Sequence, residues 1–290
     1  MIFLGTGAAE SIPNPICNCR VCQNALNSKD PKEKRARACF LIDEHNLIDF
    51  GPDVISAAGR YSKSLSHLEN IYFTHFHADH FSFCNLENFR MVRTDAPRVN
   101  IFLSEVAYNG IQAMKPLLLN FLPAKYERDF GVYDNLFTIH VMHPYETVQT
   151  GDLTVTALPT IHKAYFANET AINYLFERNG KRMLYACDTG RYCEENFEFL
   201  KNKPLDYFIV EGSFGKMQLE DDANHMCLDS LDWMYKKFKE NNTINESTKI
   251  FITHIAHKGD LTHYEYEDVI KKMMGNQANI AYDGLEIENI

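Results

Sequence analysis

The stretch Thr74-His75-Phe76-His77-Ala78-Asp79-His80 directly follows an apolar segment, residues 70–73, that has the composition of a buried strand. Neutral imidazole and carboxylate groups are suitable ligands for Zn²⁺, Mn²⁺ or Fe²⁺. One tight turn cannot direct four side chains at one ion. We therefore expect His75 and His77 to face one ion, and Asp79 and His80 to face a second. The alternative is a solvated turn that is merely rich in histidine.

Further candidate ligands stand at the ends of other apolar segments. His162 follows the run that begins at Leu158, Asp188 follows residues 185–187, and His254 follows residues 250–253. Each is a weak signal by itself, because a polar residue at a strand end is commonly a cap or a turn former. Their repetition in one structural context predicts a two-ion centre at the edge of a sheet.

The order of apolar segments predicts many strands with a few helices outside them. Two sheets covered by helices fit this order better than a strict alternation of strands and helices. We expect one domain over residues 1–290. The expected strands are 1–7, which runs into a turn at Gly5-Thr6-Gly7, a hairpin within 38–50, 70–74, 99–103, 136–142, 153–158, 171–177, 182–186, 205–210 and 250–252, and the expected helices are 106–122, 228–239 and 264–274.

Three cysteines form a compact cluster, Cys17-Asn18-Cys19-Arg20-Val21-Cys22. Three thiols at this spacing can converge on one tetrahedral ion, but a fourth ligand must come from elsewhere. Pro13 and Pro15 precede the cluster and predict a loop. The cluster favours a zinc site, and the alternative is a reactive or buried cysteine loop.

The composition excludes several classes of protein. The 290 residues include 29 Lys and Arg against 39 Asp and Glu, which gives a formal charge of −10. This excess disfavours a protein that grips a large nucleic acid, and the longest basic stretch, residues 32–37, is short and is expected to be a solvated loop. No apolar run approaches the roughly 18 residues of a membrane span. The first residues lack a signal peptide, so we expect a cytoplasmic protein.

The pattern H-x-H-x-D-H, followed by a His, an Asp and a final His, resembles the metallo-β-lactamase superfamily over nearly the whole chain. The resemblance implies an α+β fold, a four-layer αββα sandwich, with two metal ions at one edge of the paired sheets. It implies one set of ligands for each ion and a bridging aspartate. The first ion would be bound by His75, His77 and His162, the second by Asp79, His80 and His254, and Asp188 would bridge them.

Other short motifs resemble the PhnP-like phosphodiesterases, which act on a ribose cyclic phosphate. They are Leu4-Gly5-Thr6-Gly7, the cysteine cluster, Arg35-Ala36-Arg37 and Ala281-Tyr282-Asp283-Gly284. This resemblance implies that His257 completes a structural zinc site with Cys17, Cys19 and Cys22. It also implies that His225, just before an amphipathic helix, contacts phosphate or donates a proton. The alternative for His225 is a helix-start residue beside the capping candidates Asp221, Asp222 and Asn224.

The expected reaction is therefore hydrolysis of a small ribose or nucleotide phosphodiester by a metal-bridging hydroxide, with Asp79 and His225 as catalytic residues. Other readings are a tRNA 3′-processing nuclease, a lactone or thioester hydrolase, and a zinc-binding protein without activity. We expect the two active-site ions to be Zn or Mn, with Fe as a further choice. A homodimer is compatible with the sequence. The sequence leaves open whether Tyr165, Phe166 or residues 81–90 line the substrate pocket.

Overall fold

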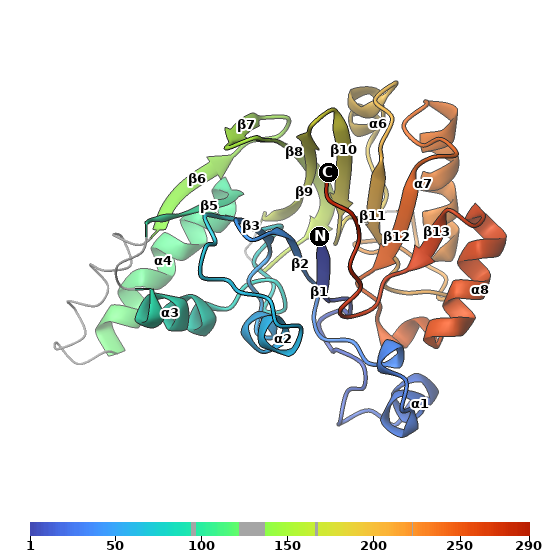
Figure 1. Cartoon of the computed structure of the whole chain (residues 1–290), viewed down its shortest axis with the longest axis horizontal. Coiled ribbons are helices and arrows are strands. Elements are labelled where there is room, and N and C mark those ends of the chain that lie inside the picture. The colour runs from blue at the N-terminus through green and yellow to red at the C-terminus, as the bar shows by residue number, and fades with distance from the viewer. Residues whose placement is uncertain (94–96, 122–136, 166–167, 222) are drawn as a thin grey trace.

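The computed structural model describes residues 1–290 except 94–96, 122–136, 166–167 and 222. In this described part, the first of two sheets has six strands in the order β1-β2-β3-β4-β5-β6 (Figure 1). Strands β1 to β3 pair antiparallel, and β3 to β6 pair parallel. The strands are β1 (Ile2–Gly5), β2 (Cys39–Asp43), β3 (Asn46–Ile48), β4 (Asn70–Tyr72), β5 (Val99–Ser104) and β6 (Phe137–Met142).

The second sheet has seven strands within the described residues, in the order β13-β12-β11-β10-β9-β8-β7. Strands β7 to β10 pair antiparallel, whereas β10 to β13 pair parallel, so the carboxyl ends of β10, β11 and β12 meet at one edge. The strands are β7 (Thr147–Thr150), β8 (Leu153–Lys163), β9 (Thr170–Arg178), β10 (Lys181–Ala186), β11 (Tyr207–Glu211), β12 (Lys249–Thr253) and β13 (Ala278–Ile280).

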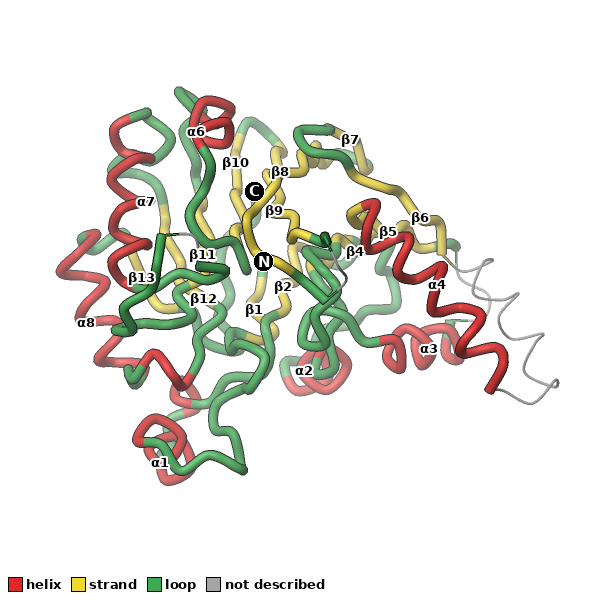
Figure 2. Tube along the Cα trace, turned by 180° about the vertical axis from the view of Figure 1, so that it is seen from behind, coloured by secondary structure: helices red, strands yellow, loops and turns green. Residues whose placement is uncertain are grey.

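Helices cover the outer face of each sheet (Figures 1 and 2). On the first sheet lie α2 (Val54–Arg60), α3 (Phe83–Val92) and α4 (Glu105–Phe121), and on the second lie α6 (Glu194–Leu200), α7 (Leu228–Glu240) and α8 (His263–Met274). A further helix, α1 (Arg20–Asn27), follows the cysteine cluster, and Pro31–Glu33 and His257–Gly259 form short 3₁₀ turns.

Apolar side chains fill the space between successive layers. Phe40 and Tyr72 of the first sheet share one cluster with Tyr185 and Phe251 of the second, so this cluster lies between the sheets. A second cluster joins the first sheet to α2, α3 and α4, and a third joins the second sheet to α6, α7 and α8. Three apolar interfaces require four layers, which confirms the predicted αββα sandwich.

The predicted strands and helices are present, with differences at their ends, and the predicted end residues 122 and 136 lie outside the described residues. Strand β8 does not end at Leu158 but continues through His162, and its pairing with β9 shifts register between Pro159 and Lys163. The predicted loop over the cysteine cluster is also too long, because α1 begins at Arg20 and includes Cys22. Among the described residues, no helix combines the length and apolar character that a membrane crossing requires.

Candidate metal centre and active site

The seven predicted His and Asp side chains come together at the edge of the two sheets. The loop after β4 carries four of them, β8 carries one, and the residues just after β10 and β12 carry one each. They are His75, His77, Asp79, His80, His162, Asp188 and His254. All but His77 are buried, which is unusual for residues of these types and calls for compensating partners.

Three imidazoles form the first group. The distance between His75 Nε2 and His77 Nδ1 is 2.8 Å, and that between His77 Nδ1 and His162 Nε2 is 3.2 Å. Nitrogens around one tetrahedral zinc ion would lie about 3.3 Å apart, because each zinc–nitrogen bond is about 2.0–2.1 Å. Burial lowers the pKa of both His75 and His77, so these rings are neutral and present lone pairs. The group can therefore hold a metal ion.

The second group lies beside the first. His80 Nε2 lies 3.4 Å from His254 Nε2, and Asp79 Oδ2 lies 3.1 Å from the former and 3.4 Å from the latter. Asp188 belongs to both groups, because its Oδ2 atom is 2.9 Å from His80 Nε2 and 3.2 Å from His75 Nε2. A carboxylate in this position can bridge two ions.

Hydrogen bonds hold the remaining ring nitrogens of three histidines. Asp49 Oδ2 accepts from His80 Nδ1 at 2.6 Å, and the Asn224 carbonyl accepts from His162 Nδ1 at 2.8 Å. The Ser213 hydroxyl lies 2.8 Å from His254 Nδ1. A ring nitrogen that is held in this way fixes the tautomer, and the other nitrogen can then face a metal ion. Asn224 thus binds His162 rather than capping α7, whose N-cap is Cys227.

The charge of the centre also fits divalent cations. Four carboxylates, those of Asp49, Asp79, Asp188 and Glu211, are buried there, and the ion pairs of these residues within the described chain are all with histidines. Asp188 Oδ1 is buried and lies 3.1 Å from His254 Nδ1 and 3.3 Å from His225 Nδ1, but neither contact has the geometry of a hydrogen bond. Two divalent ions would balance four carboxylates and satisfy this oxygen.

His225 lies next to the second group and forms an ion pair with Glu211. Its Nδ1 atom is 3.0 Å from Glu211 Oε2 and 3.3 Å from Asp188 Oδ1. Burial favours the neutral ring, but the two carboxylates outweigh it and raise the pKa of His225 to about 11. These two carboxylates therefore favour the protonated imidazole. His225 does not stand at the start of α7, because that helix begins at Leu228 with Cys227 as its N-cap, and the capping candidate Asp222 lies outside the described residues.

Two of these residues, Asp49 and Glu211, are absent from the sequence prediction. Asp49 directly follows β3, and Glu211 is the last residue of β11, so both end an apolar strand. This is the same signal that singles out Asp188. By itself, one acidic residue at the end of a strand is too weak a signal to predict a functional residue. The histidines that would strengthen it, His80 for Asp49 and His225 for Glu211, are distant in sequence or belong to another element.

A cavity of about 710 Å³ opens over the centre and is lined by His77, Asp79, Asp188, His225 and His254. Tyr165 also lines this cavity, whereas Phe166 is outside the described residues. No described side chain of residues 81–90 does so, and Phe81 instead stacks on Phe76 with ring centroids 4.0 Å apart. A cavity of this size accommodates a ligand larger than a phosphate group.

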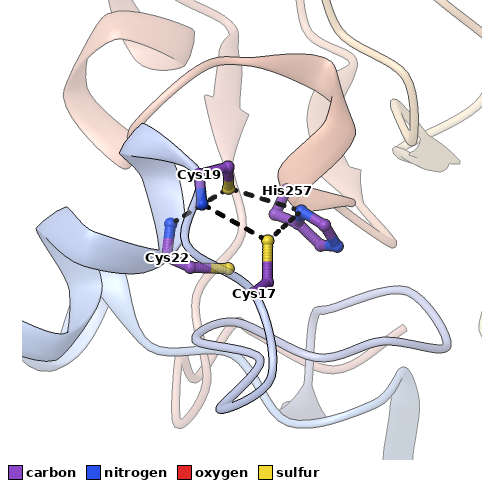
Figure 3. A group of neighbouring side chains, drawn as sticks. All are labelled: Cys17, Cys19, Cys22 and His257. Atoms are coloured by element: carbon purple, nitrogen blue, oxygen red, sulfur yellow. Dashed lines mark hydrogen bonds between the residues drawn. The ribbon is translucent and has the colours of Figure 1, made fainter.

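The cysteine cluster meets a histidine that follows β12. Figure 3 shows the sulfurs of Cys17, Cys19 and Cys22 around the ring of His257, whose Nδ1 atom is 3.5 Å from Cys17 Sγ and 3.4 Å from Cys19 Sγ. A tetrahedral ion with zinc–sulfur bonds of about 2.3 Å would separate nitrogen and sulfur by about 3.5 Å. The four side chains can therefore hold one tetrahedral ion.

A paired His and Asp centre at the edge of an αββα sandwich defines a hydrolase of the metallo-β-lactamase fold, a fold that implies divalent metal ions. The chain belongs to this superfamily: the family model of the beta-lactamase superfamily domain matches residues 45–237, more than half of its length. No curated protein gives a significant match to the chain.

Solved structures with this fold resemble the whole chain. A diphosphatase from the PhnP family is 23% identical, with a TM-score of 0.71 over 100% of this chain and 97% of that one. Zn²⁺-bound PqqB from Methylobacterium extorquens is 15% identical, with a TM-score of 0.70 over 99% of both chains. The short form of human tRNase Z is 14% identical, with a TM-score of 0.60 over 100% of this chain and 98% of that one.

Proposed function

We propose that the protein is a PhnP-like phosphodiesterase that hydrolyses a small ribose or nucleotide phosphodiester with two divalent ions, Zn²⁺ or Mn²⁺. The observation that carries this proposal is the His225–Glu211 ion pair beside Asp188. A protonated imidazole next to two metal-capable groups suits a reaction in which negative charge develops on a phosphate and an alkoxide leaves. The similarity to a diphosphatase of the PhnP family supports a reaction at phosphorus.

The residues of this chain would divide the work of the reaction. When bound, two ions would lower the pKa of a water molecule and withdraw charge from the phosphoryl oxygens. Asp188 would keep the two groups of histidines at a fixed separation, and Asp79 would orient the attacking water. Glu211 holds His225 through Nδ1, which leaves Nε2 as the nitrogen that can protonate the leaving oxygen. A positioned general acid of this kind contributes about 10²–10⁴-fold to the rate.

We infer that the group of Cys17, Cys19, Cys22 and His257 binds a structural Zn²⁺, because three thiolates and one imidazole favour zinc over harder ions. The amide of Cys22 and the neighbouring thiol and imidazole groups outweigh burial and lower the pKa of Cys19 to about 7, which favours the thiolate. Such an ion would tie the segment before α1 to the turn that follows His254.

A panel of substrates tests the reaction class. The metal-loaded protein is assayed with bis-p-nitrophenyl phosphate, a ribose 1,2-cyclic phosphate, a nucleoside diphosphate ester, a lactone and a precursor tRNA. We expect turnover of the small phosphodiesters and none of the lactone. Cleavage of the precursor tRNA with no turnover of small diesters would instead indicate a nuclease. No turnover of any phosphodiester at full metal loading would overturn the proposal.

The role of His225 is tested by His225→Ala, with the exposed His67→Ala as a matched control. Loss of the general acid should lower kcat by about 10²–10⁴-fold while the metal content stays the same. Metal content is measured by mass spectrometry of the elements in the same preparation. If His225→Ala loses metal together with activity, His225 is a ligand and the proton-donor role is wrong.

A further inference from the structure

Three sequence motifs that the candidate centre does not use meet in the interior. Thr6 comes from the glycine-rich turn after β1, Arg35 from the short basic stretch and Asp283 from the segment after β13. Their exposed fractions are 0%, 4% and 8%, so Arg35 is buried and the expectation of a solvated loop is wrong for it. We refer to Thr6, Arg35 and Asp283 as the Thr6 brace.

The Thr6 hydroxyl connects the other two members of the brace. It donates to Asp283 Oδ1 at 2.7 Å and accepts from Arg35 Nη1 at 2.7 Å. The second carboxylate oxygen of Asp283 accepts from the Ala36 amide at 2.6 Å. The Thr6 hydroxyl therefore both donates and accepts a hydrogen bond. These bonds hold together segments that are up to 277 residues apart in sequence.

The backbone of the same segment pairs with the residue next to His254. The Thr6 carbonyl accepts from the Ile255 amide at 2.9 Å, and the Ala8 amide donates to the Ile255 carbonyl at 3.0 Å. His254 itself has a φ of 55°, a left-handed conformation that is strained for a residue with a side chain. Such a conformation persists only where the surroundings determine it, and the pairing of Ile255 with residues 6–8 is part of those surroundings.

The chemistry of the brace indicates a role in geometry more than in stability. Buried charged groups contribute little net stability compared with apolar side chains of the same volume, because their desolvation is costly. They do restrict the positions that their partners can take, because each hydrogen bond has a narrow range of distance and angle. Two charged groups that hold one hydroxyl in place are therefore suited to fixing the position of the backbone segment that carries it.

We propose that Thr6, Arg35 and Asp283 are positioning residues that set the place of His254, and through it the metal affinity of the second group. For turnover this inference rests on the proposed phosphodiesterase function. For metal binding it stands independently, since His254 lies 3.4 Å from both His80 Nε2 and Asp79 Oδ2 whatever the substrate.

The test compares Thr6→Val, which keeps the shape of the side chain, with Thr6→Ser, which keeps the hydroxyl. Metal affinity is measured by competition with a chelator, and the Co²⁺-substituted protein gives a visible spectrum that reports the ligand geometry. We expect Thr6→Val to weaken the more weakly bound ion by about 10–100-fold and to change the spectrum, as is typical of residues that orient metal ligands. Thr6→Ser should keep the metal affinity and the spectrum of the wild type. In Thr6→Val, kcat should fall by a larger factor than KM rises.

Arg178→Gln serves as the matched control. Arg178 is 8% exposed by its side chain and pairs with Asp43 at 2.8 Å, so its loss also removes a mostly buried ion pair, but one outside the candidate centre. Thr6→Val with wild-type affinity and spectrum, or equal changes in Arg178→Gln, would overturn the proposal. Asp283→Asn is measured in parallel. If Thr6→Val does not fold, wild-type metal affinity and spectrum in Asp283→Asn would overturn the proposal instead. Failure of the wild type to hydrolyse phosphodiesters overturns only the proposed function, because the metal measurements do not depend on it.

Discussion

Replacing Asp49 with asparagine removes one negative charge from beneath His80 and keeps the shape of the side chain. Asp49 is fully buried, and its φ of 61° is one that asparagine also tolerates. The substitution should therefore leave the backbone conformation unchanged. One carboxylate oxygen accepts from the Thr74 amide at 2.8 Å, and the other accepts from His80 Nδ1 at 2.6 Å. An amide has one oxygen, so it can accept only one of these two hydrogen bonds.

The consequence for His80 follows from its two tautomers. If the amide oxygen stays on Thr74, the amide nitrogen faces Nδ1 of His80, and the ring proton must move to Nε2. That nitrogen is the one that faces Asp79, Asp188 and His254, and in this form it cannot bind a metal ion. A charge-assisted hydrogen bond contributes about 1.5–3 kcal/mol. This corresponds to a loss of about 10–100-fold in the affinity of the second ion.

A stepwise titration with Zn²⁺ against a competing chelator measures this loss. Asp43→Asn is the control, because Asp43 also accepts hydrogen bonds from a backbone amide and a cationic side chain but lies outside the centre. We expect the first ion to bind to Asp49→Asn as to the wild type and the second to bind more weakly. Two ions bound at wild-type affinity would show that Asp49 does not fix the tautomer of His80.

Three further predictions concern other parts of the chain. A Cβ atom at Gly51 would lie 2.0 Å from the Asp79 carbonyl oxygen, so Gly51→Ala should displace the loop of residues 74–80 and lower both the Tm and the metal content. The control is Gly59→Ala in α2, where a Cβ atom would meet nothing within 4 Å, and this variant should raise the Tm slightly. Cys22→Ser should remove one zinc ion per chain and leave the other ions, as elemental mass spectrometry would show. Burial lowers the pKa of His263 to about 4 from an ordinary 6.5, so the unfolded chain binds a proton at this residue before the folded chain does. As the pH falls from about 6.5 to 4, the free energy of unfolding should therefore decrease by about 3 kcal/mol on account of His263. His263→Gln should therefore show a flatter decline in stability over this range in urea unfolding, and equal declines in both proteins would contradict the assignment.

The candidate centre was predictable where its signal is local. Residues 74–80 concentrate ligand-type side chains in one loop, and the strand before them is apolar enough to be recognised as buried. The cysteine cluster is equally local, because its three thiols fall within one turn of chain and the first turn of α1. In both cases the spacing along the chain limits which side chains can reach a common point.

Other features became visible only in three dimensions. Pro159 did not end β8, because the pairing with β9 shifts register there and the strand resumes as far as Lys163. Glu211 meets His225 across 14 residues, and Thr6 meets Asp283 across 277. No local pattern predicts such contacts, since they depend on which strands are neighbours in a sheet.

The amino-acid sequence by itself determined the class of fold, the superfamily and the side chains that can bind metal. It did so because side-chain periodicity records which face of a strand is buried, and because ligand chemistry depends on residue type. Only the tertiary structure decided that Asp188 touches both histidine groups, that Asp49 and Glu211 hold His80 and His225, and that Arg35 is buried. The physical reason is that the parallel strands β10, β11 and β12 end at one edge, so that residues distant in sequence share a single low-dielectric site.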